Sequence, residues 1–164
     1  MSDKKIQVGD KLPDVTLRRM TEKGPEAVKT SDFFKGRKVV LFAVPGAFTP
    51  TCHNDHLPSF TKNAATFKTK GVAEVACVAI NDPFVLGAWA KSVPGADKIT
   101  FLSDGNGEFS KAIGMTFDGS GHGLGTRSHR YAMVVEDGRV KALDVEEKPG
   151  TCSISSGPAI LKKL

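Results

Sequence analysis

The chain has 164 residues, of which 40% are hydrophobic and 25% charged, and we expect it to fold as a single domain over residues 1–164. The net charge of +5 is dispersed and no basic run interleaves with aromatic residues, which argues against nucleic-acid binding. Neither a membrane-spanning apolar run nor the apolar core of a signal peptide is present, so we expect a cytoplasmic protein without a membrane partner.

The N-terminal part predicts peripheral elements. Residues 15–20 alternate apolar with polar side chains, as a half-buried strand does. Residues 22–26 are expected to form a loop. Residues 30–36 predict a capped helical turn that ends at Gly36.

A strand, a turn and a helix are predicted next, with a cysteine at the start of the helix. Residues 39–44 are apolar throughout and predict a short buried strand. After a turn at residues 45–46, Thr49 is the expected N-cap of a helix and Pro50 its first residue, since proline lacks an N–H that would be unpaired there. Cys52 then lies in the first turn, near free backbone N–H groups and the positive end of the helix dipole. This is a setting that favours a reactive thiolate, although an inert buried thiol is the alternative.

The helix after Cys52 is expected to run to Gly71 and to kink at Pro58. Proline removes one backbone hydrogen bond and its ring clashes with the preceding turn. The turn that carries Cys52 is therefore expected to be weakly coupled to the rest of the helix. The apolar positions at helical spacing are Leu57, Phe60, Ala64 and Phe67.

The remaining elements give the fold class. Asp137 and Gly138 form a strong hairpin-turn signal between two apolar runs. The order of elements predicts an α/β fold with a mixed central β-sheet and helices on both faces. In such sheets the chemistry gathers at the carboxyl ends of strands, where residues 45–52 fall. The further expected strands are 75–80, 99–102, 131–136 and 140–145, and the further helices are 83–91, 106–113 and 158–164.

Two other cysteines could take part in thiol chemistry. Three cysteines in a cytosolic chain argue against a structural disulfide framework. Cys77 lies in the middle of a predicted strand, where a small core residue is the simpler interpretation and a disulfide partner for Cys52 the alternative. Cys152 lies in a stretch rich in turn residues, and an exposed loop cysteine favours a redox role.

Two other patterns carry weaker signals. Cys52, His53 and His56 could suggest a metal site, but no fourth ligand or C-x-x-C pair accompanies them, so we expect no metal and two solvated histidines. The glycine-rich residues 118–125 lack the lysine of a phosphate-binding loop and predict a flexible loop. Arg130 follows at the border of a strand, either held there or as a solvated surface charge.

At residues 44–52 the sequence Val-Pro-Gly-Ala-Phe-Thr-Pro-Thr-Cys closely resembles the active-site signature of the peroxiredoxins, in the form of the type-II/type-V (atypical two-cysteine, redoxin) subfamily. The similarity continues through residues 79–85, Trp89, residues 123–131 and residues 145–147. It implies a thioredoxin-like fold with an N-terminal hairpin extension. It also implies a peroxidase that reduces hydrogen peroxide and alkyl hydroperoxides without a cofactor.

The same resemblance assigns roles to site residues. Cys52 is the peroxidatic cysteine, which attacks the terminal peroxide oxygen and becomes a sulfenic acid. Thr49 would hydrogen-bond both the thiolate and the peroxide, and Arg130 would stabilise the thiolate and the charge on the leaving oxygen. Pro45 would shield the sulfur from water. Backbone N–H groups of Gly46 and Cys52 would help to bind the peroxide.

The resemblance leaves the resolving cysteine open. Cys152 matches that residue in animal type-V enzymes, and Cys77 matches the cysteine proposed for the role in plant type-II enzymes. We favour Cys152, because a loop can move whereas a central strand cannot easily do so. Either disulfide requires the first turn of the Cys52 helix to unwind, which the break at Pro58 makes easier.

The family also implies partners. The disulfide or the sulfenic acid would be reduced by thioredoxin or by glutaredoxin and glutathione, and the protein would be a homodimer. One alternative is a one-cysteine peroxidase that uses an external thiol. Another is a redox-sensing or chaperone-like binding protein in which Cys52 oxidation signals to a partner. A thioredoxin-type disulfide reductase is disfavoured because no C-x-x-C is present.

Overall fold

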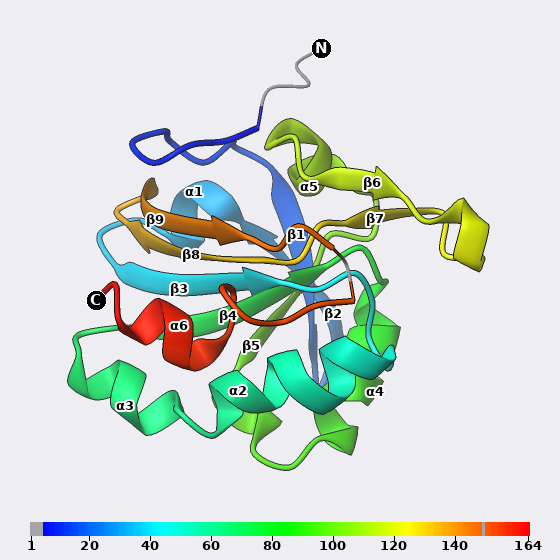
Figure 1. Ribbon diagram of the computed structural model, residues 1–164, viewed down its shortest axis with the longest axis horizontal. Coiled ribbons are helices and arrows are strands. Elements are labelled where there is room, and N and C mark those ends of the chain that lie inside the picture. The colour runs from blue at the N-terminus through cyan, green and yellow to red at the C-terminus, as the bar shows by residue number, and fades with distance from the viewer. Residues whose placement is uncertain (1–4, 149) are drawn as a thin grey trace.

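A seven-stranded mixed sheet in the order β2-β1-β5-β4-β3-β8-β9 forms the centre of the protein (Figure 1). The computed structural model describes residues 5–148 and 150–164. The first four residues, on which the expectation about a signal peptide partly rests, and Pro149 lie outside this part. The three central strands are parallel and their outer neighbours antiparallel, so the predicted α/β fold with a mixed sheet is confirmed. The strands are β1 Thr16–Thr21, β2 Gly24–Lys29, β3 Lys38–Ala43, β4 Glu74–Ala79, β5 Thr100–Ser103, β8 Tyr131–Glu136 and β9 Arg139–Val145.

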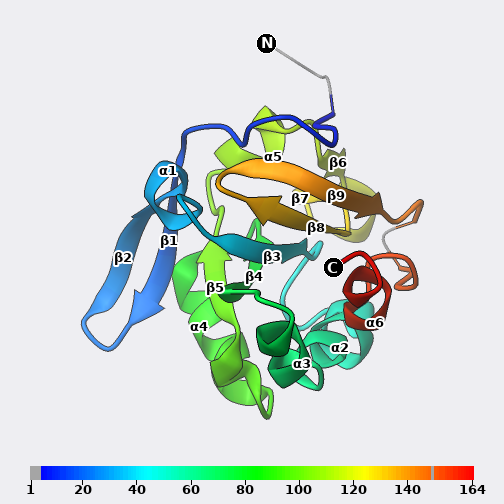
Figure 2. The ribbon, with the colours of Figure 1, turned by 90° about the vertical axis from the view of Figure 1, so that its left-hand side faces the viewer.

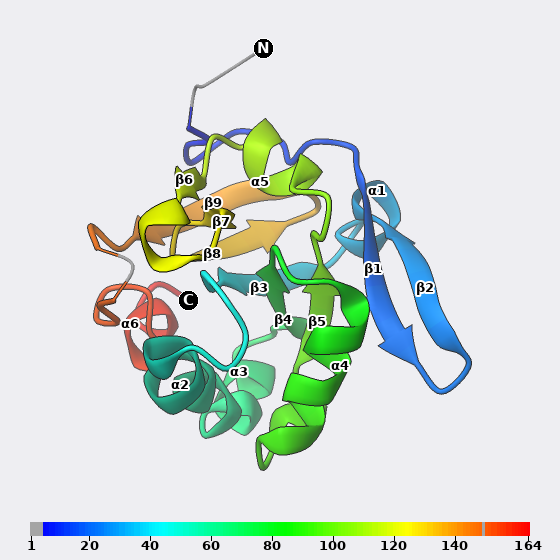
Figure 3. The ribbon, with the colours of Figure 1, turned by 90° about the vertical axis from the view of Figure 1, so that its right-hand side faces the viewer.

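Helices cover both faces of this sheet (Figures 2 and 3). Alternate residues of β3 point to opposite faces, so Val40 and Phe42 join one apolar core while Val39 and Leu41 join the other. The first core lies beneath α2, α3, α4 and α6, and the second beneath α1 and α5. Burial on both faces explains why the central strands are apolar throughout. The helices are α1 Thr30–Phe33, α2 Leu57–Thr61, α3 Ala64–Thr69, α4 Pro83–Ser92, α5 Glu108–Ala112 and α6 Gly157–Leu161.

The hairpins agree only in part with the sequence prediction. Asp137 and Gly138 join β8 to β9 with positive φ angles of 49° and 78°, as a tight hairpin turn requires. The expected loop over residues 22–26 is wrong beyond Lys23, since β2 begins at Gly24 and pairs with β1 along its whole length. This pair forms the N-terminal hairpin that the resemblance implied, and it projects from one edge of the sheet (Figure 2).

The long helix expected up to Gly71 is interrupted twice. Before Pro58 the backbone forms a π-helical turn, Cys52–His56, in which the N–H of Leu57 donates to the carbonyl of Cys52. The wider turn relieves the clash that a proline ring makes in a regular α-helix. A second break at residues 62–63 separates α2 from α3, and there the side chain of Asn63 donates to the carbonyl of Ser59 at 2.7 Å. The predicted irregularity at Pro58 is thus present as a π-turn.

Shorter elements complete the structure. Two 3-10 turns are Ala96–Lys98 and Ser120–His122. The second lies in the glycine-rich segment, between the short strands β6 Thr116–Asp118 and β7 Thr126–Ser128. No helix within residues 5–148 and 150–164 is long and apolar enough to cross a membrane.

Candidate active site

The loop between β3 and the first helical turn has the predicted strand–turn–helix form. Helical geometry begins at Pro50, and the N–H of His53 donates to the carbonyl of Thr49 at 2.8 Å, so Thr49 stands at the N-cap position. Its hydroxyl donates to the carbonyl of Gly46 at 2.6 Å. The Thr49 side chain therefore links the two ends of the turn between Gly46 and Thr49. The lone pairs of its hydroxyl oxygen stay available to accept a hydrogen bond.

Neighbouring elements hold this loop from outside. The N–H of Ala47 donates to the side chain of Asn81 at 2.9 Å, which links the loop to the end of β4. Arg127 donates to the carbonyl of Pro45 at 3.2 Å, so β7, which follows the glycine-rich segment, brings a second arginine to the site. Phe48 adopts a positive φ of 63°, which is strained for an aromatic residue and is typical of backbone held in place by its surroundings.

Cys52 and Arg130 meet at the centre of the site. Nη2 of Arg130 donates to Sγ of Cys52 at 3.0 Å, although the two residues are 78 positions apart. Cys52 is fully buried and Arg130 is only 2% exposed. The guanidinium cannot lose its charge, so its contact with the sulfur away from water places a fixed cation where negative charge develops on the sulfur. The alternative of Arg130 as a solvated surface charge is therefore wrong.

His56 supports Arg130 from its other side. Nδ1 of His56 lies 3.0 Å from Nη1 of Arg130, and Nε2 lies 2.8 Å from the carbonyl oxygen of Ser155. An arginine can only donate and a carbonyl can only accept, so the ring is neutral with its proton on Nε2. Burial, and then the charge of Arg130, lower the pKa of His56 to about 3.

The prediction of two solvated histidines is wrong for His56, whereas His53 is partly exposed. His56 is fully buried, because the C-terminal segment covers it through a contact that spans 99 residues, and local sequence does not predict that contact. His53 accepts a hydrogen bond at Nδ1 from the indole N–H of Trp89 at 3.0 Å. A sequence signal for His56 did exist, because a spacing of four residues places it on the same helical face as Cys52.

The other two cysteines lie in different surroundings. Cys77 is fully buried in the middle of β4, and burial raises the pKa of its thiol well above the usual range, with a further contribution from Cys52. Cys152 is half-buried in the segment before α6, and burial raises its pKa to about 11. All three cysteines are free thiols. Cys77 and Cys152, the two possible disulfide partners of Cys52, are thus protonated at neutral pH.

A carboxylate that sequence reasoning missed holds the Cys152 segment. Glu146 follows β9 and accepts hydrogen bonds from the N–H of Ser153 at 2.7 Å, and from the N–H and hydroxyl of Ser155 at 2.8 and 2.6 Å. Burial acts to raise the pKa of Glu146, but these hydrogen bonds outweigh it and hold the pKa below its usual value. Glu146 is therefore a charged anchor for this part of the backbone.

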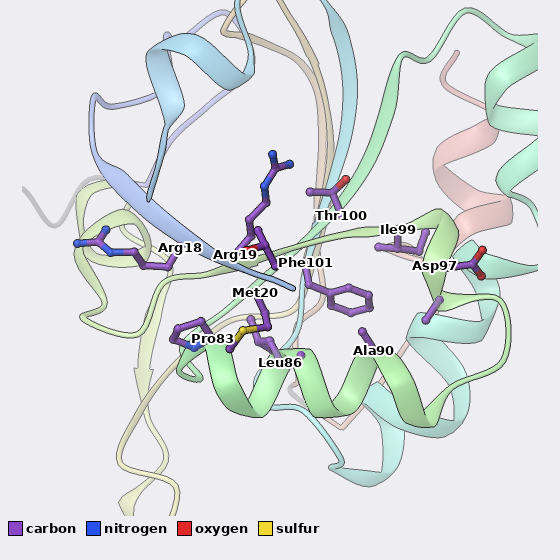
Figure 4. A pocket seen from close by; sticks show the side chains of 13 residues that line it. Arg18, Arg19, Met20, Pro83, Leu86, Ala90, Asp97, Ile99, Thr100 and Phe101 are labelled. Carbon is purple, nitrogen blue, oxygen red and sulfur yellow. The ribbon is translucent and has the colours of Figure 1, made fainter. Parts of the chain in front are cut away.

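The surroundings of this site hold no metal-binding cluster among the described residues, and a pocket on the sheet edge lies apart from it. Among the residues that the structure describes, no cluster of three or more His, Cys, Asp or Glu side chains could hold a metal ion. A shallow pocket of about 360 Å³ lies between β1, α4 and β5 (Figure 4). Its lining includes Arg18, Met20 and Leu86 but not Cys52, His56 or Arg130.

Comparison with known proteins agrees with this geometry. Residues 7–161 match the Redoxin family. The chain is 45% identical to peroxiredoxin-2C of Oryza sativa subsp. japonica, over 97% of this chain and 98% of that protein. It is also 45% identical to the chloroplastic peroxiredoxin-2E of Arabidopsis thaliana, over 97% of this chain and 69% of that protein.

Solved structures show the same fold. Reduced Prx3 of Vibrio vulnificus in complex with H2O2 superposes with a TM-score of 0.91 and 43% identity, covering 96% of this chain and 98% of that one. Peroxiredoxin 5 of Alvinella pompejana superposes with a TM-score of 0.84 and 38% identity, covering 96% of both chains.

Proposed function

The chain belongs to the Redoxin family as a type-II peroxiredoxin, and we propose that it reduces hydrogen peroxide and alkyl hydroperoxides in a two-cysteine cycle that Cys152 completes. It is a thiol-dependent peroxidase with the peroxidatic Cys52 beside Arg130. The contact of 3.0 Å between Nη2 of Arg130 and the buried Sγ carries the proposed attack of Cys52 on peroxide.

In the first step the Cys52 thiolate attacks the terminal oxygen of the peroxide. The S–O bond forms as the O–O bond breaks, leaving a sulfenic acid and an alkoxide or hydroxide that takes a proton. Arg130 stabilises the thiolate before attack and the leaving oxygen during it, since a fixed cation in a dry site needs no reorganisation. The similar Vibrio vulnificus protein was crystallised with H2O2, which supports this substrate class.

The loop before Cys52 is suited to orient the peroxide. The hydroxyl of Thr49 donates to Gly46 and can accept a hydrogen bond from the peroxide O–H. The N–H groups of Gly46 and Cys52 would bind the peroxide oxygens. Pro45 is buried and would keep water from the sulfur.

In the second step the thiol of Cys152 attacks the sulfenic sulfur, and a disulfide forms with release of water. Two observations favour Cys152 over Cys77. Cys152 lies in a segment that already touches the Cys52 turn, since Thr51 donates to the carbonyl of Gly150 at 2.9 Å. Cys77 lies between β3 and β5 in the core, so its use would require part of the sheet to open.

Thioredoxin or glutaredoxin with glutathione would then reduce the disulfide, supplying two electrons and two protons.

We also propose a homodimer. Phe48, on the loop before Cys52, and Phe84, in the first turn of α4, are 51% and 65% exposed. The hydrogen bond between Ala47 and Asn81 joins that loop to the segment just before α4, and such exposed aromatic side chains are typical of interfaces. Sedimentation of the reduced protein and of Phe84→Ser tests this, and a wild-type protein that stays monomeric at micromolar concentration contradicts it.

Peptide mass spectrometry after one equivalent of peroxide tests the cycle. We expect a Cys52–Cys152 linkage in the wild type and a persistent sulfenic acid in Cys152→Ser. A Cys52–Cys77 linkage would reverse the assignment, and no disulfide at all would indicate a one-cysteine cycle. Cys52→Ser should abolish peroxide consumption, and activity in that variant would refute the whole mechanism.

A further inference from the structure

One continuous set of hydrogen bonds joins the reactive sulfur to the segment that carries Cys152. Arg130 contacts Cys52 through Nη2 and His56 through Nη1, both at 3.0 Å. His56 in turn donates from Nε2 to the carbonyl of Ser155 at 2.8 Å. Ser155 donates its own N–H and hydroxyl to Glu146. The residue that supports the arginine therefore also fixes the neighbourhood of Cys152.

Further contacts hold the same segment against the helix that carries Cys52. At one end Thr51 donates to the carbonyl of Gly150, and at the other the N–H of Gly157 donates to the hydroxyl of Ser59 at 2.9 Å. The backbones approach so closely that a Cβ on Gly157 would lie 2.2 Å from the carbonyl oxygen of Ser59. The segment is thus held at both ends, with the His56–Ser155 bond between them.

His56 can form both of its bonds in only one state. The ring must be neutral with the proton on Nε2, because Arg130 requires an acceptor and Ser155 requires a donor. His56 is also part of the π-turn that contains Cys52. If this turn opens after oxidation of Cys52, His56 must leave Arg130 and Ser155 together. Opening of the Cys52 turn and release of the segment would then be one event.

We propose that His56 is a positioning residue that orients Arg130 for attack on peroxide and, together with Glu146, retains the Cys152 segment until the Cys52 turn opens. If Cys152 is the resolving cysteine, release of the segment also changes the rate of disulfide formation. This consequence alone rests on the proposed function. Positioning of Arg130 and retention of the segment can each be measured without any disulfide.

Two substitutions of His56 separate the two halves of this role. In His56→Asn the side-chain oxygen falls near the position of Nδ1 and can still accept from Arg130, but the contact with Ser155 is lost. In His56→Gln the amide nitrogen reaches toward the position of Nε2 and can still donate to Ser155, but the acceptor for Arg130 is lost. Glu146→Gln weakens the side-chain anchor of the segment and leaves in place the backbone hydrogen bond from the N–H at position 146 to the carbonyl of Arg130.

Two readouts on the reduced proteins test the proposal. The first is the rate of Cys52 sulfenic acid formation, and the second is the rate at which N-ethylmaleimide labels Cys152, quantified by peptide mass spectrometry. We expect oxidation of His56→Gln to slow by about tenfold or more and that of His56→Asn to slow less, since a bond to a charged group is lost only in the former. We expect labelling of Cys152 to accelerate by about three- to tenfold in His56→Asn and Glu146→Gln and to change less in His56→Gln.

Equal effects of both His56 variants on both readouts would overturn the proposal, because His56 would then be a structural residue only. Unchanged labelling in Glu146→Gln would overturn the retention of the segment, even if the His56 variants fold poorly. If the wild type forms no Cys52–Cys152 disulfide, the proposed resolving step fails, while oxidation and labelling rates still decide the role of His56.

Discussion

Nη2 of Arg130 lies 3.0 Å from Sγ of Cys52, and this contact is made where neither side chain meets bulk water. The cation is itself supported by a neutral histidine. The site is therefore arranged before peroxide binds, with its donors fixed toward the sulfur and the place where negative charge develops.

Substitution of Arg130 by lysine should slow peroxide attack by about hundredfold. Lysine keeps the charge, but a single ammonium group cannot replace the planar fork that contacts Cys52 and His56 together. Stopped-flow fluorescence of Trp89, the sole tryptophan, measures the rate, since its indole donates to His53 in the Cys52 turn. Arg19→Lys, in an exposed ion pair with Glu26, is the matched control and should react like the wild type.

Gly46→Ala should reduce the rate of peroxide attack by about tenfold or more through displacement of the loop. The new Cβ would lie 2.8 Å from Nη1 of Arg127 and 3.2 Å from Cγ2 of Thr49, so at least one of them must move. Gly121→Ala is the control, because nothing lies within 4 Å of the added atom. Saturation kinetics with hydrogen peroxide measures the effect, and equal rates in the two variants would show that the loop tolerates the shift.

The two non-peroxidatic cysteines should differ in their contribution to stability. Cys77→Ser places a hydroxyl in the apolar core and should lower the free energy of unfolding by about 1–3 kcal/mol. Cys152→Ser, at a half-buried position, should change it by less than about 0.5 kcal/mol. Urea denaturation of the fully reduced proteins measures both, and similar values for the two variants would contradict the difference in burial.

Stability should fall as pH decreases below about 6.5, in part because of His56. Its pKa is about 3 in the folded protein against 6.5 for an ordinary histidine. Below pH 6.5 the unfolded chain therefore binds a proton that the folded protein excludes, and the loss grows until the folded pKa is reached. The lowered pKa of Glu146 acts in the same direction, since its contribution is also lost at low pH.

Between about pH 6.5 and pH 4 the contribution of His56 amounts to roughly 3 kcal/mol. Chemical denaturation at a series of pH values should show a weaker pH dependence in His56→Asn than in the wild type. His122→Asn, at an exposed position in the glycine-rich segment, should keep the wild-type dependence. A wild-type slope in His56→Asn would mean that other groups account for the acid sensitivity.

The sequence by itself determined the elements that depend on neighbouring residues. The apolar run before Pro45, the N-cap at Thr49 and the turn at Asp137 each rely on local backbone preferences, and each was found as predicted. The irregularity of the helix at Pro58 could be predicted for the same reason. The missing N–H of proline disturbs a helix whatever that helix packs against. The β2 strand escaped prediction because its residues are mostly exposed and carry no apolar alternation.

Only the tertiary structure decided what surrounds the sulfur. Arg130 reaches Cys52 because β8 pairs with β3, and His56 is buried because the segment before α6 folds back over the first helical turn. Glu146 became an anchor by accepting four hydrogen bonds from Ser153 and Ser155 in that same segment. Such contacts depend on how distant elements pack. Local propensity and periodicity carry no information about them, so a buried histidine that supports the arginine looked like a solvated residue on a helix.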